Sequence, residues 1–178
     1  MFLKKSLAMT TGLLMSFGCA ASSVSLSFNN DNVDLNYNFE LQETLNLKGT
    51  YLQTVDNGYT LDTGLYASQD VGAIFSEIGA KVMVMDTDNG DGYALAFGGV
   101  TGLHLTEELS VNLEGHYSPE ILGSGDVENY LQFGGGITYA VLPSADLYVK
   151  YVFTDIDYDN EKTESVTRDV LFGMKWVF

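Results

Sequence analysis

Apolar and polar residues alternate along nearly every segment of this chain from Ser23 onward. The clearest run is 33–41, where every second residue is apolar and the residues between them are Asp34, Asn36, Asn38 and Glu40. Side chains two positions apart share a face of an extended strand, so such a run predicts a β-strand with one apolar and one polar face. Turn sequences such as Asp56-Asn57-Gly58 separate the runs, and no helical period interrupts them. The pattern predicts one all-β, antiparallel domain.

Ten strands account for the alternation, and eight is the alternative because the first pair is brief. They are expected near residues 24–28, 33–41, 45–55, 59–67, 74–85, 93–105, 109–118, 129–141, 146–154 and 168–178. The connections after strands two, four, six and eight are expected to be short. Those after strands five, seven and nine are expected to be mostly longer and acidic, and they include Pro119–Glu128 and Asp155–Thr167.

The amino-terminal segment has the layout of a secretory signal peptide. Lys4 and Lys5 precede an apolar run, 7–17, and small residues follow at 18–21. The run is too short for a membrane helix, which needs roughly 20 apolar residues. Removal of residues 1–21 leaves a domain, 22–178, without cysteine, which excludes disulfides and thiol chemistry. The alternative is a lipoprotein with Cys19 as its lipidated first residue, although the preceding residues form a poor lipobox.

The net charge of −16 excludes nucleic acid as a partner. Charge also marks the polar face of the predicted strands. Ten charged residues take the parity opposite the apolar row: Asp34, Glu40, Lys48, Asp62, Glu77, Lys81, Glu114, Lys150, Asp169 and Lys175. In a soluble sandwich or a lipocalin-like barrel they would form the solvated surface. In a membrane barrel they would line the lumen, where they must pair because an unpaired buried charge costs several kcal/mol.

Aromatic residues favour the membrane alternative. Five lie on the apolar row at the strand ends nearest the long connections: Tyr51, Tyr59, Tyr93, Tyr117 and Phe153. Trp176 and Phe178 mark the opposite rim. Two girdles around an aliphatic band are typical of a wall that faces a bilayer. An even strand number also returns the chain to its starting side, as bacterial single-chain barrels require. We therefore expect an antiparallel transmembrane β-barrel in the outer membrane of a Gram-negative cell.

Two resemblances point the same way. The final strand, with Gly173, Trp176 and the terminal Phe178, resembles the closing strands of bacterial outer-membrane barrels, which implies recognition by the barrel-assembly machinery. The runs 92–99, 117–120 and 142–143, followed by Tyr151, resemble the YfaZ family of small predicted outer-membrane proteins, most clearly between Gly92 and Tyr158. That family implies the fold and supplies no catalytic residues.

Two groups of residues suggest chemistry. His116 and Ser118 are similar to the His-x-Ser pair of outer-membrane lipid A deacylases, in which a histidine base activates a serine. Their parity points them into the lumen, away from lipid, so the alternative is that they are lumenal polar residues. Asp155, Asp157 and Asp159 are a possible metal site that could share divalent cations with lipopolysaccharide phosphates. A true EF-hand is excluded because Asn160 replaces the turn glycine, and a solvated acidic loop is the alternative.

The function expected from the sequence is that of a small, monomeric outer-membrane barrel with a structural or surface-interaction role. It is expected to contact membrane lipid and lipopolysaccharide and to have neither catalysis nor a cofactor. The first alternative is a narrow channel, and the excess of acids over lysines on the polar row gives it a weak preference for cations. The second is a lipid A-modifying hydrolase that uses His116 and Ser118.

Overall fold

The computed structural model describes residues 22–55, 58–88, 90–159 and 162–178, so the predicted signal peptide, 1–21, lies outside the described residues. Eleven strands and one short 3-10 helix make up this part of the chain. Their bounds are β1 Ser22–Phe28, β2 Asn32–Gln42, β3 Leu45–Thr54, β4 Gly58–Val71, β5 Ile74–Thr87, β6 Gly90–His104, β7 Leu109–Ser118, η1 Glu120–Leu122, β8 Gly123–Gly125, β9 Val127–Leu142, β10 Ala145–Tyr158 and β11 Lys162–Val177. Within the described residues, no helix is long and apolar enough to cross a membrane.

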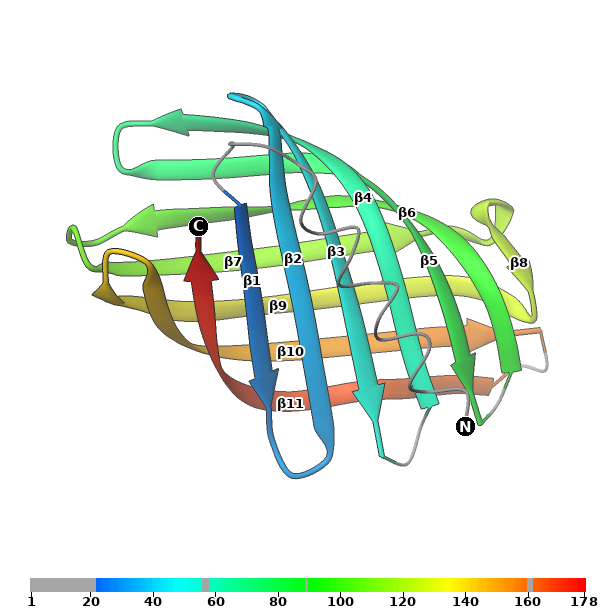
Figure 1. Cartoon of the computed structure of the whole chain (residues 1–178). Helices are drawn as coiled ribbons and strands as arrows, with labels where there is room; N and C mark the ends of the chain where they lie inside the picture. Colours follow the sequence, from blue (N-terminus) through cyan, green and yellow to red (C-terminus); the bar gives the residue numbers. More distant parts are fainter. Residues whose placement is uncertain (1–21, 56–57, 89, 160–161) are drawn as a thin grey trace.

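The strands close into an antiparallel barrel of ten, as the alternation predicts (Figure 1). Each strand pairs with its neighbour in sequence, except that β7 pairs with β9, and the pairing of β1 with β11 completes the ring. The short strand β8 pairs only with the start of β6 and stands outside the ring. Both ends of the domain meet on one rim, where Ser22 and Phe178 exchange two backbone hydrogen bonds of 3.1 and 2.9 Å. We call this the terminal rim and the opposite one the far rim.

The outer wall is apolar. Leu61, Leu65, Val82, Val84 and Leu113 are all about half exposed, although burial would be favourable for each of them in water. Trp176, on the terminal rim, also points outward and is 44% exposed. A continuous exposed apolar wall of this extent is expected of a surface solvated by lipid. The predicted orientation of the apolar row is therefore confirmed.

The predicted lengths of two far-rim connections are wrong. Segment 155–167, expected as a charged loop, is mostly strand: β10 continues to Tyr158 and β11 begins at Lys162. The acidic connection at 86–92 shrinks in the same way to the turn between β5 and β6. Outside a membrane a hairpin needs no apolar outer residues, so hydrophobic alternation underestimates strand length there. The connection after β7, residues 119–126, is long as predicted, and it contains η1 and β8.

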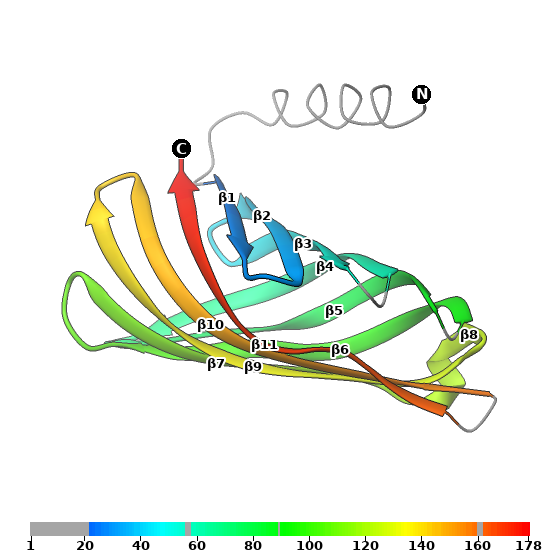
Figure 2. The same cartoon turned by 90° about the horizontal axis from the view of Figure 1, so that it is seen from below.

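In the far half of the barrel, one side of the ring lacks backbone pairing between strands. β1 is short and pairs with β11 only at 172–177, so the far half of β11 extends beyond the β1–β2 hairpin (Figure 1). Side chains bridge the space instead. Asn32 donates to Asp169 at 2.8 Å, and Thr54 of β3 donates to Asn32 at 3.0 Å. Figure 2 shows β1–β3 on one side of the interior and β7 and β9 on the other.

An apolar cluster occupies the interior of this far half. It draws on both sides of the ring and consists of Leu52, Met83, Met85, Ala94, Ala96, Val127, Tyr130, Ile156, Tyr158 and Val166. We call it the plug. Its members on β5 alternate with outward-facing Val82 and Val84, so residues 82–85 are apolar on both faces of one strand. A strand covered on both faces has such a continuous apolar run.

Candidate functional site

A layer of paired charges crosses the lumen next to the plug. Lys81, on β5, is 4% exposed, and its ammonium group donates to Asp62 at 2.9 Å, Gln132 at 2.7 Å and the Tyr130 hydroxyl at 3.3 Å. Tyr130 belongs to the plug, so the apolar and charged layers touch through it. The ammonium group has three N–H donors, and each of them has an acceptor here. Such pairing is what makes a charge tolerable away from water.

Three more lysines form ion pairs on the inner wall. Lys150 lies 2.7 Å from Asp34, and Lys175 lies 2.5 Å from Asp146 on the adjacent β10. Lys48 pairs with Glu77, whose other carboxylate oxygen accepts a hydrogen bond of 3.0 Å from Asn46. Each described lysine of the inner wall is therefore matched by a carboxylate.

Nine of the ten charged residues expected in the lumen line its cavities, and Asp169 lies nearer the far rim, where it accepts the hydrogen bond from Asn32. Sequence reasoning missed Asp146, although it shares the parity of Lys150 on the same strand. It also missed the buried Glu164, which was assigned to a loop. The plug was missed as well, although the apolar run 82–85 carried a signal for it.

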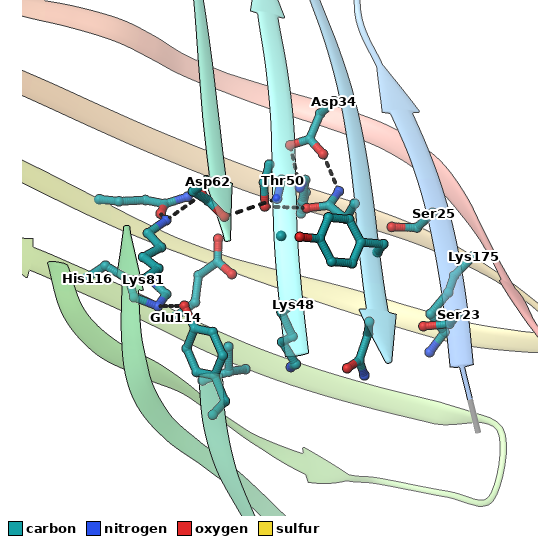
Figure 3. Close-up of a pocket in the computed structure, with 18 residues that line it drawn as sticks. Ser23, Ser25, Asp34, Lys48, Thr50, Asp62, Lys81, Glu114, His116 and Lys175 are labelled. Atoms are coloured by element: carbon teal, nitrogen blue, oxygen red, sulfur yellow. Dashed lines mark hydrogen bonds and ion pairs between the residues drawn. The ribbon is translucent and has the colours of Figure 1, made fainter. Parts of the chain in front are cut away.

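Three cavities in the lumen share lining residues, and Figure 3 shows the residues around one of them, the deeper cavity described below. A cavity of about 610 Å³ at the terminal rim, the vestibule, is lined by polar side chains that include Glu40, Glu43 and Asp70. It shares Ser23, Asn38 and Lys175 with a deeper cavity of about 290 Å³. That cavity shares a further set of residues with a third of about 250 Å³, namely Ser25, Asn36, Lys48, Val100, Glu114, Lys150 and Lys175. We call the second and third cavities together the chamber.

His116 and Ser118 do not form a catalytic pair in this structure. His116 is 8% exposed, and its Nε2 atom lies 3.0 Å from the Tyr66 hydroxyl. Ser118 is fully buried, and its hydroxyl has no hydrogen-bond partner within the described residues. An activated serine needs a base within about 2.6–3.2 Å. Both side chains face the lumen, as their parity indicates. The histidine is hydrogen-bonded to Tyr66 rather than to Ser118.

Asp155, Asp157 and Asp159 lie along the end of β10 and the turn after it. Asp155 contacts Arg168 at 3.8 Å and accepts a hydrogen bond from Ser165, while Asp157 accepts one of 2.6 Å from Thr163. In the part of the chain that the structure describes, no three acidic, histidine or cysteine side chains are grouped so that they could hold a metal ion. The side chains of Asp155 and Asp157 are thus engaged by neighbours on the same hairpin.

The residues of the expected assembly signal occupy the seam of the barrel. Trp176 lies opposite Val24 of β1 and Ala145 of β10 on the outer wall. Gly173 lies on the inner wall, where the Tyr148 ring packs so closely against it that a Cβ atom would clash with the ring. The glycine therefore has a packing role in addition to any role in recognition.

An apolar outer wall around an interior of paired charges defines an outer-membrane β-barrel protein. The comparisons with known proteins agree with this class. The family described as "YfaZ precursor" matches residues 3–178, so the chain belongs to the YfaZ family. One relative, Outer membrane protein YfaZ of Escherichia coli (strain K12), is 25% identical over 159 residues, which are 88% of this chain and 88% of the relative. The protein is located in the outer membrane, and the description of its family as a precursor supports a signal peptide.

Solved structures show the same fold. The outer membrane protease OmpT of Escherichia coli is similar with a TM-score of 0.59 and 10% identity over 89% of this chain and 93% of that one. The KdgM porin in complex with disordered oligogalacturonate is similar with a TM-score of 0.52 and 11% identity, over 89% and 99% of the two chains. At such identities the likeness extends to the fold alone.

Proposed function

We propose that the protein is a closed outer-membrane barrel with a structural or surface-interaction role, without catalysis and without an open pore. The plug is the observation that carries this proposal. Its side chains come from β3, β5, β6, β9, β10 and β11 and meet across the lumen, and eight of them are at most 2% exposed: Met83, Met85, Ala94, Ala96, Tyr130, Ile156, Tyr158 and Val166. An ion would lose its hydration shell on entering such a layer, and apolar side chains offer no polar groups to replace the lost water.

The ion-pair layer below the plug supports the same proposal. An ion that reached Lys81 would meet an ammonium group whose three N–H donors are already engaged. The channel alternative would need both layers to move aside. The fully buried Ser118 disfavours the hydrolase alternative, because a lipid substrate could not reach its hydroxyl from the outer wall.

Planar-bilayer recording on refolded protein tests the closed state. We expect no stepwise conductance from the native protein. The double variant M83S/M85S replaces two plug side chains and is expected to leak. V82A/V84A is the matched control, because it shortens two lipid-facing neighbours on the same strand and is expected to remain silent. Stepwise conductance of the native protein would favour the channel alternative.

The proposed surface role rests on the acidic far rim. Asp86, Asp88, Asp91, Asp126 and Asp159 are all exposed there. Lipopolysaccharide phosphates surround a barrel on the outer leaflet, and divalent cations shared between these phosphates and the rim carboxylates would relieve the repulsion. Mg²⁺ is then expected to raise the unfolding temperature in vesicles that contain lipopolysaccharide and not in phosphatidylcholine vesicles. D86N/D88N/D91N is expected to reduce this gain, and an equal gain in both kinds of vesicle would contradict the idea.

The closing strand supports a second partner, the barrel-assembly machinery. The double variant W176A/F178A keeps Gly173 and the inner wall but removes two outward aromatic side chains. It is expected to lower the amount of folded barrel recovered from cell envelopes while refolding into detergent normally. Normal recovery from envelopes would remove the support for recognition of these residues.

A further inference from the structure

One carboxylate of the chamber forms no salt bridge within the described residues, although Lys48 and Lys150, which pair with other acids, also attract it electrostatically. Glu114, on β7, reaches into the chamber (Figure 3) and lines both of its cavities. The four lysines of the inner wall form ion pairs with Asp34, Asp62, Glu77 and Asp146. Within the described residues Glu114 takes part in no ion pair or hydrogen bond, and it lies close over Gly134, where a larger residue would meet its carboxylate at 2.9 Å. With Glu77 and Asp146, the partners of Lys48 and Lys175, counted beside the groups that line the chamber, five carboxylates face four lysines, an excess of one negative charge.

The chamber also has more unpartnered hydrogen-bond acceptors than donors, an observation that does not depend on the count of charges. His116 is more than nine-tenths buried, and its Nδ1 atom has no partner among the described residues. When its Nε2–H group donates to Tyr66, Nδ1 is a free acceptor. The Asn38 side-chain oxygen, at the junction of vestibule and chamber, is also buried, and no donor from the described part of the chain reaches it. Three acceptors, on Glu114, His116 and Asn38, thus line a space in which the four lysines are already engaged. The buried Tyr148 hydroxyl, which lines the same space, also has no partner among the described residues, so acceptors outnumber donors there by three to one.

A guest that satisfies these groups must bring donors and a positive charge. A primary ammonium group offers three N–H donors and no acceptor. An anion such as a phosphate or a uronate would face Glu114 without a free lysine. The plug blocks entry from the far rim, so a guest enters from the terminal rim, where the mouth carries the exposed acids Glu43 and Asp70. We propose that the chamber binds a small primary alkylammonium compound that enters from the terminal rim.

Titration calorimetry of the refolded protein in detergent micelles with 1,4-diaminobutane tests the proposal. We expect saturable binding of the diamine, and no binding of 1,4-butanediol, which has the same length without the charge. E114Q removes the free charge while preserving shape, and it is expected to weaken binding by about tenfold or more, since a charge-assisted hydrogen bond is roughly twice as strong as a neutral one. D86N/D88N is the matched control: it removes two exposed carboxylates from the far rim and is expected to bind like the native protein.

Three results would overturn the proposal: no saturable binding by the native protein, unchanged affinity in E114Q, or an equal loss in D86N/D88N, which would indicate diffuse attraction to an acidic protein. Heat-modifiable gel mobility verifies that each variant is folded. If E114Q fails to fold, N38A decides, because Asn38 is only partly buried as a residue and tolerates truncation. Its affinity is expected to fall several-fold through the loss of one acceptor, and an unchanged affinity overturns the proposal.

Discussion

Arginine in place of Leu113 tests where the outer wall meets the hydrocarbon. Leu113 lies midway along β7, between Thr101 of β6 and Gly135 of β9, and its side chain is 57% exposed on the outer wall. On the lipid face of a barrel an arginine costs about 2–4 kcal/mol at the bilayer midplane and about 0–1 kcal/mol near the interfaces. On a surface that faces water, the same change usually alters stability by no more than about 0.5 kcal/mol. The two environments thus predict separable results.

Leu105→Arg is the matched control, because Leu105 is comparably exposed but lies in the terminal-rim turn after β6. L113R is expected to lower the free energy of unfolding by about 2–4 kcal/mol and L105R by about 0–1 kcal/mol. Guanidinium titration in phospholipid vesicles measures both, and Trp176, the single tryptophan, reports on the outer wall. Equal, small effects of the two variants would refute the placement of Leu113 at the midplane.

Further predictions concern the inner wall and are measured by the same unfolding titration. Gly173→Ala is expected to cost about 1–3 kcal/mol, because the new Cβ atom would overlap the Tyr148 ring. Tyr148→Phe is expected to be neutral or stabilising, since the buried Tyr148 hydroxyl has no partner in the described ranges, and a large loss would reveal a bond to that hydroxyl. Asp62→Asn is expected to cost about 3–5 kcal/mol by leaving Lys81 without its carboxylate, whereas D62N/K81M is expected to recover much of this loss. If D62N/K81M is no more stable than D62N, the pair is not the source of the effect.

Alternation was sufficient to predict the barrel, its strand number and the orientation of its wall, because a side-chain period of two leaves one face for lipid and one for the lumen. It could not give the far ends of β5, β10 and β11. There the strands stand in water on their outer side, and acidic residues such as Asp155 and Asp157 occupy positions that would be apolar in a membrane. A hairpin that needs no apolar face has the same sequence signal as a loop.

The sequence predicted which residues line the lumen but not which of them contact one another. Parity placed Lys81 and Asp62 on the inner face, yet their pairing depends on the register of β4 against β5, where Asp62 lies opposite Met83 rather than Lys81. Parity likewise placed His116 and Ser118 on one face. It could not show that Tyr66, from β4, binds the histidine. Contacts across the lumen join residues far apart in sequence, and a pattern of period two contains no information on them.

The inner row of β5 summarises how the lumen is layered. From the terminal rim it runs through Phe75 and Glu77 in the vestibule, Lys81 in the ion-pair layer and Met83 and Met85 in the plug. From Glu77 to Met85 this row therefore changes from charged to apolar in the direction in which the cavity closes. An interior that becomes progressively drier is accessible from the terminal rim alone, and this asymmetry links a closed barrel to a chamber that can still admit a small guest. A substitution that opened the plug would connect the chamber with the far rim as well as with the terminal rim. Conductance therefore reports on the plug, and diamine binding reports on the chamber.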